Sequence, residues 1–195
     1  MKIISFGGRI ASGKGELSKI CEEYGFTIVR FATALKCLVS ELVGFEIMHD
    51  TSAKDRVINL ILSSEQMRYI SDMTSIPYEN VAKELEGKPI IRVRDALQLI
   101  GTNLIRKYNP NWHVDKLREE IYSDKSKNYV IEDMRYPNEK NMVDEMGGEC
   151  WYIVRPTFDH VSNHSSEISL SWYDFGNHVI INDSTLSNFK TSEIK

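Results

Sequence analysis

The chain has 195 residues, of which 42% are apolar and 27% are charged, and its net charge is −4. This length and composition are typical of a folded globular protein with one domain, or one domain with insertions. The acidic balance argues against a protein that binds polymeric nucleic acid, since such proteins usually carry a basic surface. No segment approaches the roughly 20 apolar residues of a membrane-spanning helix, so we expect no membrane partner.

The three cysteines, Cys21, Cys37 and Cys150, are an odd number without paired metal-ligand spacing. Reduced thiols in a cytoplasmic protein are the simplest interpretation. The first residues, MKIISFGG, form too short an apolar run for a signal peptide, which agrees with a cytoplasmic location. For a viral chain, that location is the cytoplasm of the host cell.

The first 31 residues predict the opening of a parallel α/β fold. An apolar strand over residues 2–6 is followed by a glycine-rich turn and a helix over 14–24, and a second strand covers 26–31. Gly25 ends the predicted helix. Strand, glycine-rich turn, helix and strand in this order indicate a parallel sheet with helices on its faces.

The pattern is helical nearly throughout from residue 32 to about residue 122, and strands return only after it. We predict a core of residues 1–31 and 128–195, a helical insertion over 32–127, and a polar lid loop over 156–171. The predicted helices cover residues 34–43, 53–69, 78–85, 93–108, 114–122, 138–146 and 184–190, and the later strands cover 129–132, 149–154 and 178–181.

The turn after the first strand has the spacing of a phosphate-binding loop. Gly8 and the pair Gly13-Lys14 enclose four residues, among them Ala11 and Ser12. The main-chain N–H groups of such a turn form an anion site, together with the N-terminus of the following helix. Lys14 would reach the terminal phosphates as a point charge. The alternative is an ordinary glycine-rich turn between a strand and a helix.

The residues after this lysine depart from the usual pattern. Gly15 stands where Ser or Thr normally follows, and Glu16 comes next. Glu16 either holds a water of Mg²⁺ or is an ordinary acidic residue in the first turn of a helix. Asp133 is a second metal candidate, because it ends a buried strand and parallel sheets bind ligands beyond the carboxyl ends of their strands. Mg²⁺ needs only one or two carboxylates beside phosphates and water.

Further polar residues are candidates around the same phosphates. Arg135 either stabilises a phosphoryl group in transfer or pairs with Glu139 on the surface. Arg155 lies at the base of the predicted lid, which would exclude water from the reaction. Asn182, in the C-terminal INDS segment, is a candidate for lining the adenine pocket of a nucleotide.

The predicted insertion carries candidates for binding a second anion. Four polar residues follow one another at four-residue steps, namely Arg94, Gln98, Thr102 and Arg106. An amide suits a base edge and a guanidinium suits a phosphate, but a solvated helix face has the same pattern. Trp112 either stacks on a ligand or anchors the helix. Arg30 and Lys36, just past the second strand, are acceptor-phosphate candidates or ordinary surface charges.

Taken in order, these motifs resemble the deoxynucleoside monophosphate kinases of bacteriophages. The loop also resembles that of adenylate kinase, where Gly again follows the Lys and a Thr comes next. The elements that carry the resemblance are the Gly-Lys loop, Phe-Ala-x-x-Leu-Lys at 31–36, Leu-Gln-x-x-Gly-Thr at 97–102 with Arg106 and Trp112, Asp-x-Arg-x-x-x-Glu at 133–139, His-x-Ser-Glu at 164–167, and Asn182-Asp183.

The resemblance implies a P-loop kinase fold, with a helical acceptor-binding insertion and a lid, that transfers the γ-phosphoryl group of ATP to a deoxynucleoside 5′-monophosphate. Small nucleotides and Mg²⁺ are then its ligands, the accepted base stays undetermined, and a homodimer stays open. The donor residues would be Gly8, Ala11, Ser12, Gly13, Lys14, Gly15, Glu16 and Asn182, with Asp133 holding Mg²⁺ through water and Arg135 and Arg155 stabilising charge. The acceptor residues would be Arg30, Lys36, Gln98, Thr102, Arg106 and Trp112.

Two rival functions remain at this point. One is a kinase for another small phosphorylated acceptor, such as dephospho-coenzyme A or phosphomevalonate. The other is a nucleotide-binding module that transfers no phosphate, which the unusual residues at positions 15 and 16 motivate.

Overall fold

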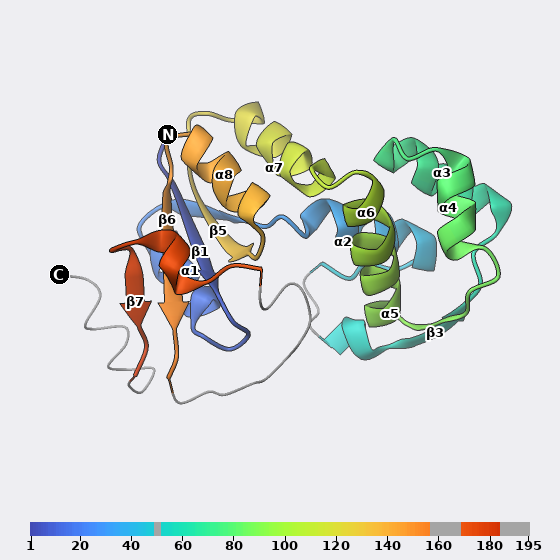
Figure 1. Ribbon diagram of the computed structural model, residues 1–195, viewed down its shortest axis with the longest axis horizontal. Helices are drawn as coiled ribbons and strands as arrows, with labels where there is room; N and C mark the ends of the chain where they lie inside the picture. The colour runs from blue at the N-terminus through green and yellow to red at the C-terminus, as the bar shows by residue number, and fades with distance from the viewer. Residues whose placement is uncertain (49–51, 157–168, 184–195) are drawn as a thin grey trace. The chain divides into compact units, whose positions relative to one another are not determined.

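The computed structural model of the protein describes residues 1–48, 52–156 and 169–183. The chain divides into two compact units, whose elements are labelled in Figure 1. The sheet unit consists of Met1–Phe31 and Leu117–Lys195, and the helical unit consists of Ala32–Lys116. The predicted insertion over 32–127 begins at the same residue but runs on past Lys116, since the later part of helix α7 (Trp112–Ser123) belongs to the sheet unit.

The described part of the sheet unit contains a five-stranded sheet in which every neighbouring pair of strands is parallel. Its order is β2-β5-β1-β6-β7, so β1 lies in the middle with β5 and β6 on its two sides. The strands are β1 (Ile3–Gly8), β2 (Phe26–Val29), β5 (Asn128–Met134), β6 (Glu149–Val154) and β7 (Val179–Ile181). The predicted parallel sheet is therefore confirmed, and the carboxyl ends of β1, β2 and β5 meet at one edge.

Helices α1 (Lys14–Glu23) and α8 (Pro137–Glu145) cover opposite faces of this sheet. Helix α1 joins β1 to β2 and α8 joins β5 to β6, and these two connections cross the sheet in opposite directions. Because such crossovers are right-handed, they place their helices on opposite faces. Leu17 of α1 packs against Phe6, Val130 and Ile153, and this contact fixes the helix that follows the glycine-rich loop.

The helical unit is built around one apolar core. Its fully or almost fully buried members include Leu38, Val39, Ile70, Leu85 and Ile100. The helices that supply the core are α2 (Thr33–Val43), α3 (Ser64–Thr74), α4 (Tyr78–Leu85), α5 (Val93–Gln98), η2 (Leu99–Ile105), α6 (Arg106–Tyr108) and the first turn of α7. A core of this size is consistent with a unit that holds its own shape rather than a loose insertion.

The helix predicted over residues 93–108 is confirmed as one continuous helical stretch, but its middle part, η2, is π-helical. Gly101 lies in this part, and a Cβ added there would come within 2.5 Å of Leu35 Cδ2. The glycine therefore permits close packing of this stretch against α2.

The single helix predicted over residues 53–69 is wrong. The structure has η1 (Ser52–Asp55), β3 (Val57–Leu60) and α3 there, and β3 pairs antiparallel with β4 (Ile90–Arg92), which the sequence analysis does not predict. The β-branched pair Val57-Ile58 favours an extended backbone. Ser63 then starts a new helix, because its side chain and main chain exchange hydrogen bonds with Gln66 in a capping box.

Two predicted segments cannot be compared with the structure. Residues 157–168, which make up most of the predicted lid, and the predicted helix over 184–190 lie outside the described residues. Within the described ranges, the helices are all too short or too polar to cross a membrane.

Cys150 in β6 gives a pH-dependent prediction. Its side chain is 5% exposed, and burial raises the pKa of its thiol to about 12. The unfolded chain would ionise this thiol near its ordinary pKa of 9.0, so the stabilisation is complete below pH 9 and is lost as the pH rises through 12. Between about pH 9 and pH 11, we expect the unfolding free energy to fall more steeply than in Cys150→Ala, by at most about 1.4 kcal/mol per pH unit. Urea denaturation measures both slopes, and equal slopes would contradict the prediction.

Candidate active site

The loop between β1 and α1 has the backbone of an anion cradle. Gly8, Ala11 and Gly13 all have positive φ angles, of 139°, 59° and 111°. A Cβ on Gly8 would lie 2.6 Å from the carbonyl oxygen of Ile153 and 2.8 Å from Ser12 Oγ, so only glycine fits at this position. The loop leads directly into the N-terminus of α1, whose positive end favours a bound anion.

Lys14, the first residue of α1, places a buried positive charge on this loop. Its side chain is only 9% exposed, and its Nζ donates to the carbonyl oxygens of Gly8 and Arg9, both at 2.7 Å. The ammonium is thereby held against the same turn that carries the main-chain donors. This position fits the predicted contact of Lys14 with the terminal phosphates of a nucleotide.

Ser12 and Asn182 support the loop from within the fold. Ser12 carbonyl oxygen accepts a hydrogen bond from Asn182 Nδ2 at 2.9 Å, and the main-chain N–H of Asn182 donates to Val154 at 2.8 Å. Ser12 is 2% exposed, and its Oγ has no hydrogen-bond partner among the described residues. Asn182 therefore braces the loop, and its predicted contact with adenine stays a prediction. An orphaned hydroxyl inside a cradle that a Cβ would fill fits a phosphate ligand.

Strand β5 brings two adjacent carboxylates to the same edge of the sheet. Asp133 Oδ1 accepts from the main-chain N–H of Phe31 at 2.9 Å. Glu132 Oε1 accepts from Arg30 Nε in an ion pair. Asp133 alone is predicted from the sequence as a metal candidate on this strand, although Glu132 directly precedes it at the strand end. The two contacts tie the end of β5 to the residues that leave β2.

Two arginines complete this side of the site. Arg155 Nη1 donates to the carbonyl oxygen of Ala11 at 3.1 Å, so the guanidinium contacts the loop. Arg135 follows β5, and its main-chain N–H donates to Glu139 Oε2 at 2.6 Å. Glu139 is fully buried and also accepts from the main-chain N–H of Tyr136. The alternative with Glu139 on the surface is therefore excluded, and this carboxylate fixes the turn that carries Arg135.

A cavity of about 460 Å³ joins the loop to the carboxylates and arginines. Its lining residues are Ile10, Ala11, Ser12, Gly13, Lys14, Gly15, Glu16, Glu132, Asp133, Arg135 and Arg155. The cations among these residues are Lys14, Arg135 and Arg155. The anions are Glu16, Glu132 and Asp133. Within the described ranges, no three His, Cys, Asp or Glu side chains gather as ligands of one metal ion. One or two carboxylates suffice for Mg²⁺ that is also bound by phosphates and water.

The two unusual residues after Lys14, Gly15 and Glu16, differ in their neighbours within this cavity. Glu16 forms an ion pair with Lys19 at 3.2 Å, and its side chain is 29% exposed. This contact along the surface of α1 favours the interpretation of Glu16 as an ordinary first-turn residue. Gly15 is exposed, and outside its chain neighbours and the backbone of α1, the nearest heavy atom to a Cβ placed on it is Glu132 Oε2, at 4.0 Å.

The predicted acceptor residues are divided between the two units. Arg30 belongs to the sheet unit, where it pairs with Glu132. The others belong to the helical unit, in which Lys36 Nζ donates to the carbonyl oxygen of Met48 at 3.4 Å. Three of them lie along one helical stretch, where Gln98 is exposed and Thr102 and Arg106 are half-buried. The first member of the predicted polar row, Arg94, instead pairs with Asp55 at 2.9 Å.

Trp112 is a member of the apolar core of the helical unit. It is 5% exposed, and its Nε1 donates to the carbonyl oxygen of Met73 at 3.0 Å. Of the two roles considered for this residue, the structure favours anchoring of the helix over stacking on a ligand.

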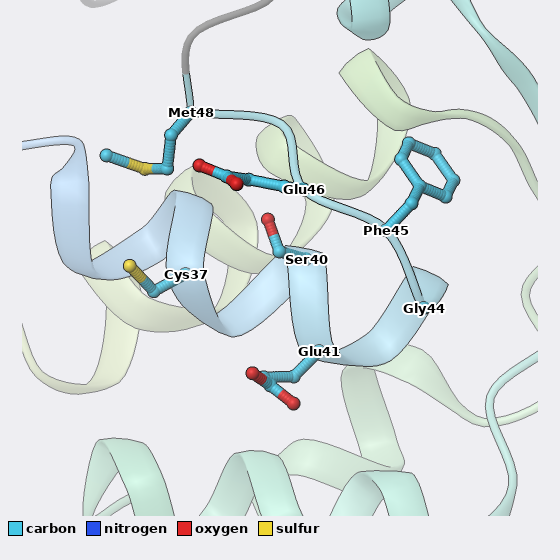
Figure 2. A pocket seen from close by; sticks show the side chains of 7 residues that line it. All are labelled: Cys37, Ser40, Glu41, Gly44, Phe45, Glu46 and Met48. Carbon is cyan, nitrogen blue, oxygen red and sulfur yellow. The ribbon is translucent and has the colours of Figure 1, made fainter.

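The helical unit also has a hollow of about 480 Å³ beside α2 (Figure 2). The side chains around it are Cys37, Ser40, Glu41, Phe45, Glu46 and Met48, with Gly44 at its edge. Two carboxylates and no Lys or Arg among these lining residues make this hollow unsuited to a phosphate. It therefore does not compete with the loop cavity as a phosphate site.

Two solved structures are similar to this chain at 14% sequence identity. They are a dephospho-CoA kinase from Campylobacter jejuni, with a TM-score of 0.46, and a protein from Thermus thermophilus, with a TM-score of 0.48. Each comparison covers 97% of this chain and 92% of the other.

A curated protein of Acanthamoeba polyphaga mimivirus, named "Putative deoxynucleotide monophosphate kinase", is 28% identical over 206 residues. The match covers 97% of this chain and 92% of that relative. The family model of deoxynucleotide monophosphate kinases matches residues 39–192, which is most of the chain. The chain therefore belongs to the deoxynucleotide monophosphate kinase family and is a nucleotide kinase.

Proposed function

We propose that the protein transfers the γ-phosphoryl group of ATP to the 5′-phosphate of a deoxynucleoside monophosphate. The observation that carries this proposal is the buried Lys14 ammonium on a glycine cradle, in one cavity with Asp133 and two arginines. Family membership supports the class of reaction. In this reaction an acceptor phosphate oxygen forms a bond to the γ-phosphorus while the bond to the β-phosphate oxygen breaks, and ADP leaves.

The residues of the sheet unit would bind the donor. Lys14 and the main-chain N–H groups of the loop would hold the phosphates of ATP, and Asp133 would hold Mg²⁺ through water. Bound Mg²⁺ would neutralise charge on the phosphates. Arg135 and Arg155 would stabilise the charge of the transferred group, because guanidinium groups in the same cavity as Lys14 are already in place before the reaction.

The residues of the helical unit would bind the acceptor. Lys36 and Arg106 would neutralise the acceptor phosphate, and Gln98 and Thr102 would contact the nucleoside. Arg30, in the sheet unit, stays a candidate for contact with the acceptor phosphate. The π-helical segment that contains Thr102 supports this proposal, since π-helical turns occur frequently at functional sites.

An acceptor panel tests the proposed function. ADP release from Mg·ATP is coupled to a spectrophotometric signal in the presence of dAMP, dGMP, dCMP or dTMP, with AMP and dephospho-coenzyme A as comparison acceptors. We expect ADP release that requires one of the deoxynucleoside monophosphates, with the diphosphate as second product. Release only with dephospho-coenzyme A would replace this proposal by the rival acceptor. Binding of ATP without ADP release on any acceptor would favour the non-catalytic module.

A further inference from the structure

We propose that Glu132 replaces, from β5, the loop hydroxyl that phosphate-binding loops normally direct at the metal ion. In the usual pattern this hydroxyl belongs to the Ser or Thr after the lysine, and here that position is Gly15. The inference rests on the proposed function and names a further residue on the metal side of the same site.

The first support is the position of the Glu132 carboxylate. Oε2 lies 4.0 Å from where a Cβ on Gly15 would be, and apart from the chain neighbours and the nearby backbone of α1, no other heavy atom of the described residues comes within 4 Å of that point. The φ angle of Gly15 does not lie in the left-handed region, so the backbone does not require glycine here. Because Gly15 has no side chain, space remains beside it, and the carboxylate of Glu132 lies next to that space.

The second support is the orientation of this carboxylate. Its Oε1 is held by Arg30 Nε, and both side chains are partly buried, with 20% of Glu132 and 32% of Arg30 exposed. With Oε1 engaged by Arg30, the other oxygen, Oε2, is the carboxylate atom that lies beside Gly15. Glu132 lines the same cavity as Lys14 and Asp133.

The chemistry of the donor set agrees with this placement. Mg²⁺ prefers oxygen ligands, retains several waters and uses one or two carboxylates with substrate phosphates. Glu132 and Asp133 supply two carboxylates at one strand end, and Arg30 balances the charge of the first. A role for Glu132 in positioning Arg30 alone is the competing explanation, and it makes a different prediction for the loss of Arg30.

The test measures Mn²⁺ binding to the protein–ADP complex by electron paramagnetic resonance, and ADP binding in EDTA by calorimetry. We expect Glu132→Gln to weaken Mn²⁺ binding by about tenfold or more, as loss of groups around a metal site does, without weakening metal-free ADP binding. Arg30→Gln should weaken Mn²⁺ binding by less than Glu132→Gln does, because the glutamine amide can still donate to Oε1 and the carboxylate keeps its charge. Adding Gly15→Ser to Glu132→Gln should restore part of the affinity, since it supplies the usual hydroxyl.

Unchanged Mn²⁺ affinity in Glu132→Gln would overturn the inference, as would an equal loss in Arg30→Gln. If Glu132→Gln does not fold, Glu132→Asp, which keeps the charge but withdraws it from Gly15, must weaken Mn²⁺ binding for the inference to stand. Failure of the proposed function is seen separately, because the unmodified protein would then release no ADP in the acceptor panel. If the unmodified protein transfers phosphate normally and Glu132→Gln binds Mn²⁺ as tightly as it does, only the proposed role of Glu132 is contradicted, and the proposed function stands.

Discussion

Lys14→Met is expected to lower the turnover number by at least about a hundredfold, which corresponds to roughly 3 kcal/mol of transition-state stabilisation. The side chain of Lys14 is buried, and its ammonium lies on the carbonyl oxygens of Gly8 and Arg9, within the turn that would hold the phosphates. Methionine has a similar length without the charge. The coupled ADP-release assay at saturating ATP and acceptor measures the loss.

Lys19→Met is the matched control for this substitution. Lys19 lies on the same helix, but its side chain is 63% exposed and forms an exposed ion pair with Glu16. Its loss should change the turnover number by less than about twofold, because exposed ion pairs contribute little. An unimpaired Lys14→Met enzyme would contradict the role of Lys14. Equal urea midpoints of the two variants would show that a loss in Lys14→Met is not due to unfolding.

Gly8→Ala is expected to weaken ATP binding by more than about tenfold and to destabilise the fold by roughly 2–4 kcal/mol. The added Cβ would stand 2.6 Å from the carbonyl oxygen of Ile153, which is main chain of a central strand and cannot move aside easily. It would also stand 2.8 Å from Ser12 Oγ, inside the cradle itself. Calorimetric titration with ATP and urea denaturation measure the two effects.

Gly25→Ala separates backbone strain from steric conflict. Gly25 also has a positive φ, of 84°, but a Cβ on it would meet no atom within 4 Å. It should therefore cost only about 1–2 kcal/mol of stability and leave ATP affinity unchanged. A Gly8→Ala protein as stable as Gly25→Ala, with unaltered ATP affinity, would show that the loop has no need of glycine at position 8.

That the glycine-rich loop and Asp133 line one cavity could be predicted from the sequence, because the signals are local. The spacing from Gly8 to Lys14 encodes the loop, and Asp133 lies near the end of an apolar strand, at the sheet edge that also carries the loop. Glu132 is missed because its proposed role depends on its distance in space from Gly15 in α1, which no spacing along the chain records. Nothing local distinguishes it from an ordinary acidic residue at a strand end.

Part of the helical insertion could not be predicted correctly, because its conformation depends on contacts between distant parts of the chain. Residues 53–69 have enough apolar residues to resemble one long helix, but pairing of β3 with β4 decides their conformation, and its partner strand is far along the chain. The role of Trp112 could not be decided from the sequence either, because an indole can stack on a ligand or pack in an apolar core. Only its burial and its bond to Met73 distinguish the two.

The hydrogen bond from Phe31 gives Asp133 a structural role in addition to its proposed role in binding Mg²⁺. Phe31 is the last residue of the sheet unit before the chain enters the helical unit at Ala32, so Asp133 anchors the end of this unit's first segment and also lines the cavity of the glycine-rich loop. Truncating the side chain to alanine would release that anchor and remove the charge together. Asp133→Asn keeps an oxygen acceptor for the Phe31 N–H but removes the charge. It therefore distinguishes an electrostatic defect from the loss of the hydrogen bond that holds Phe31.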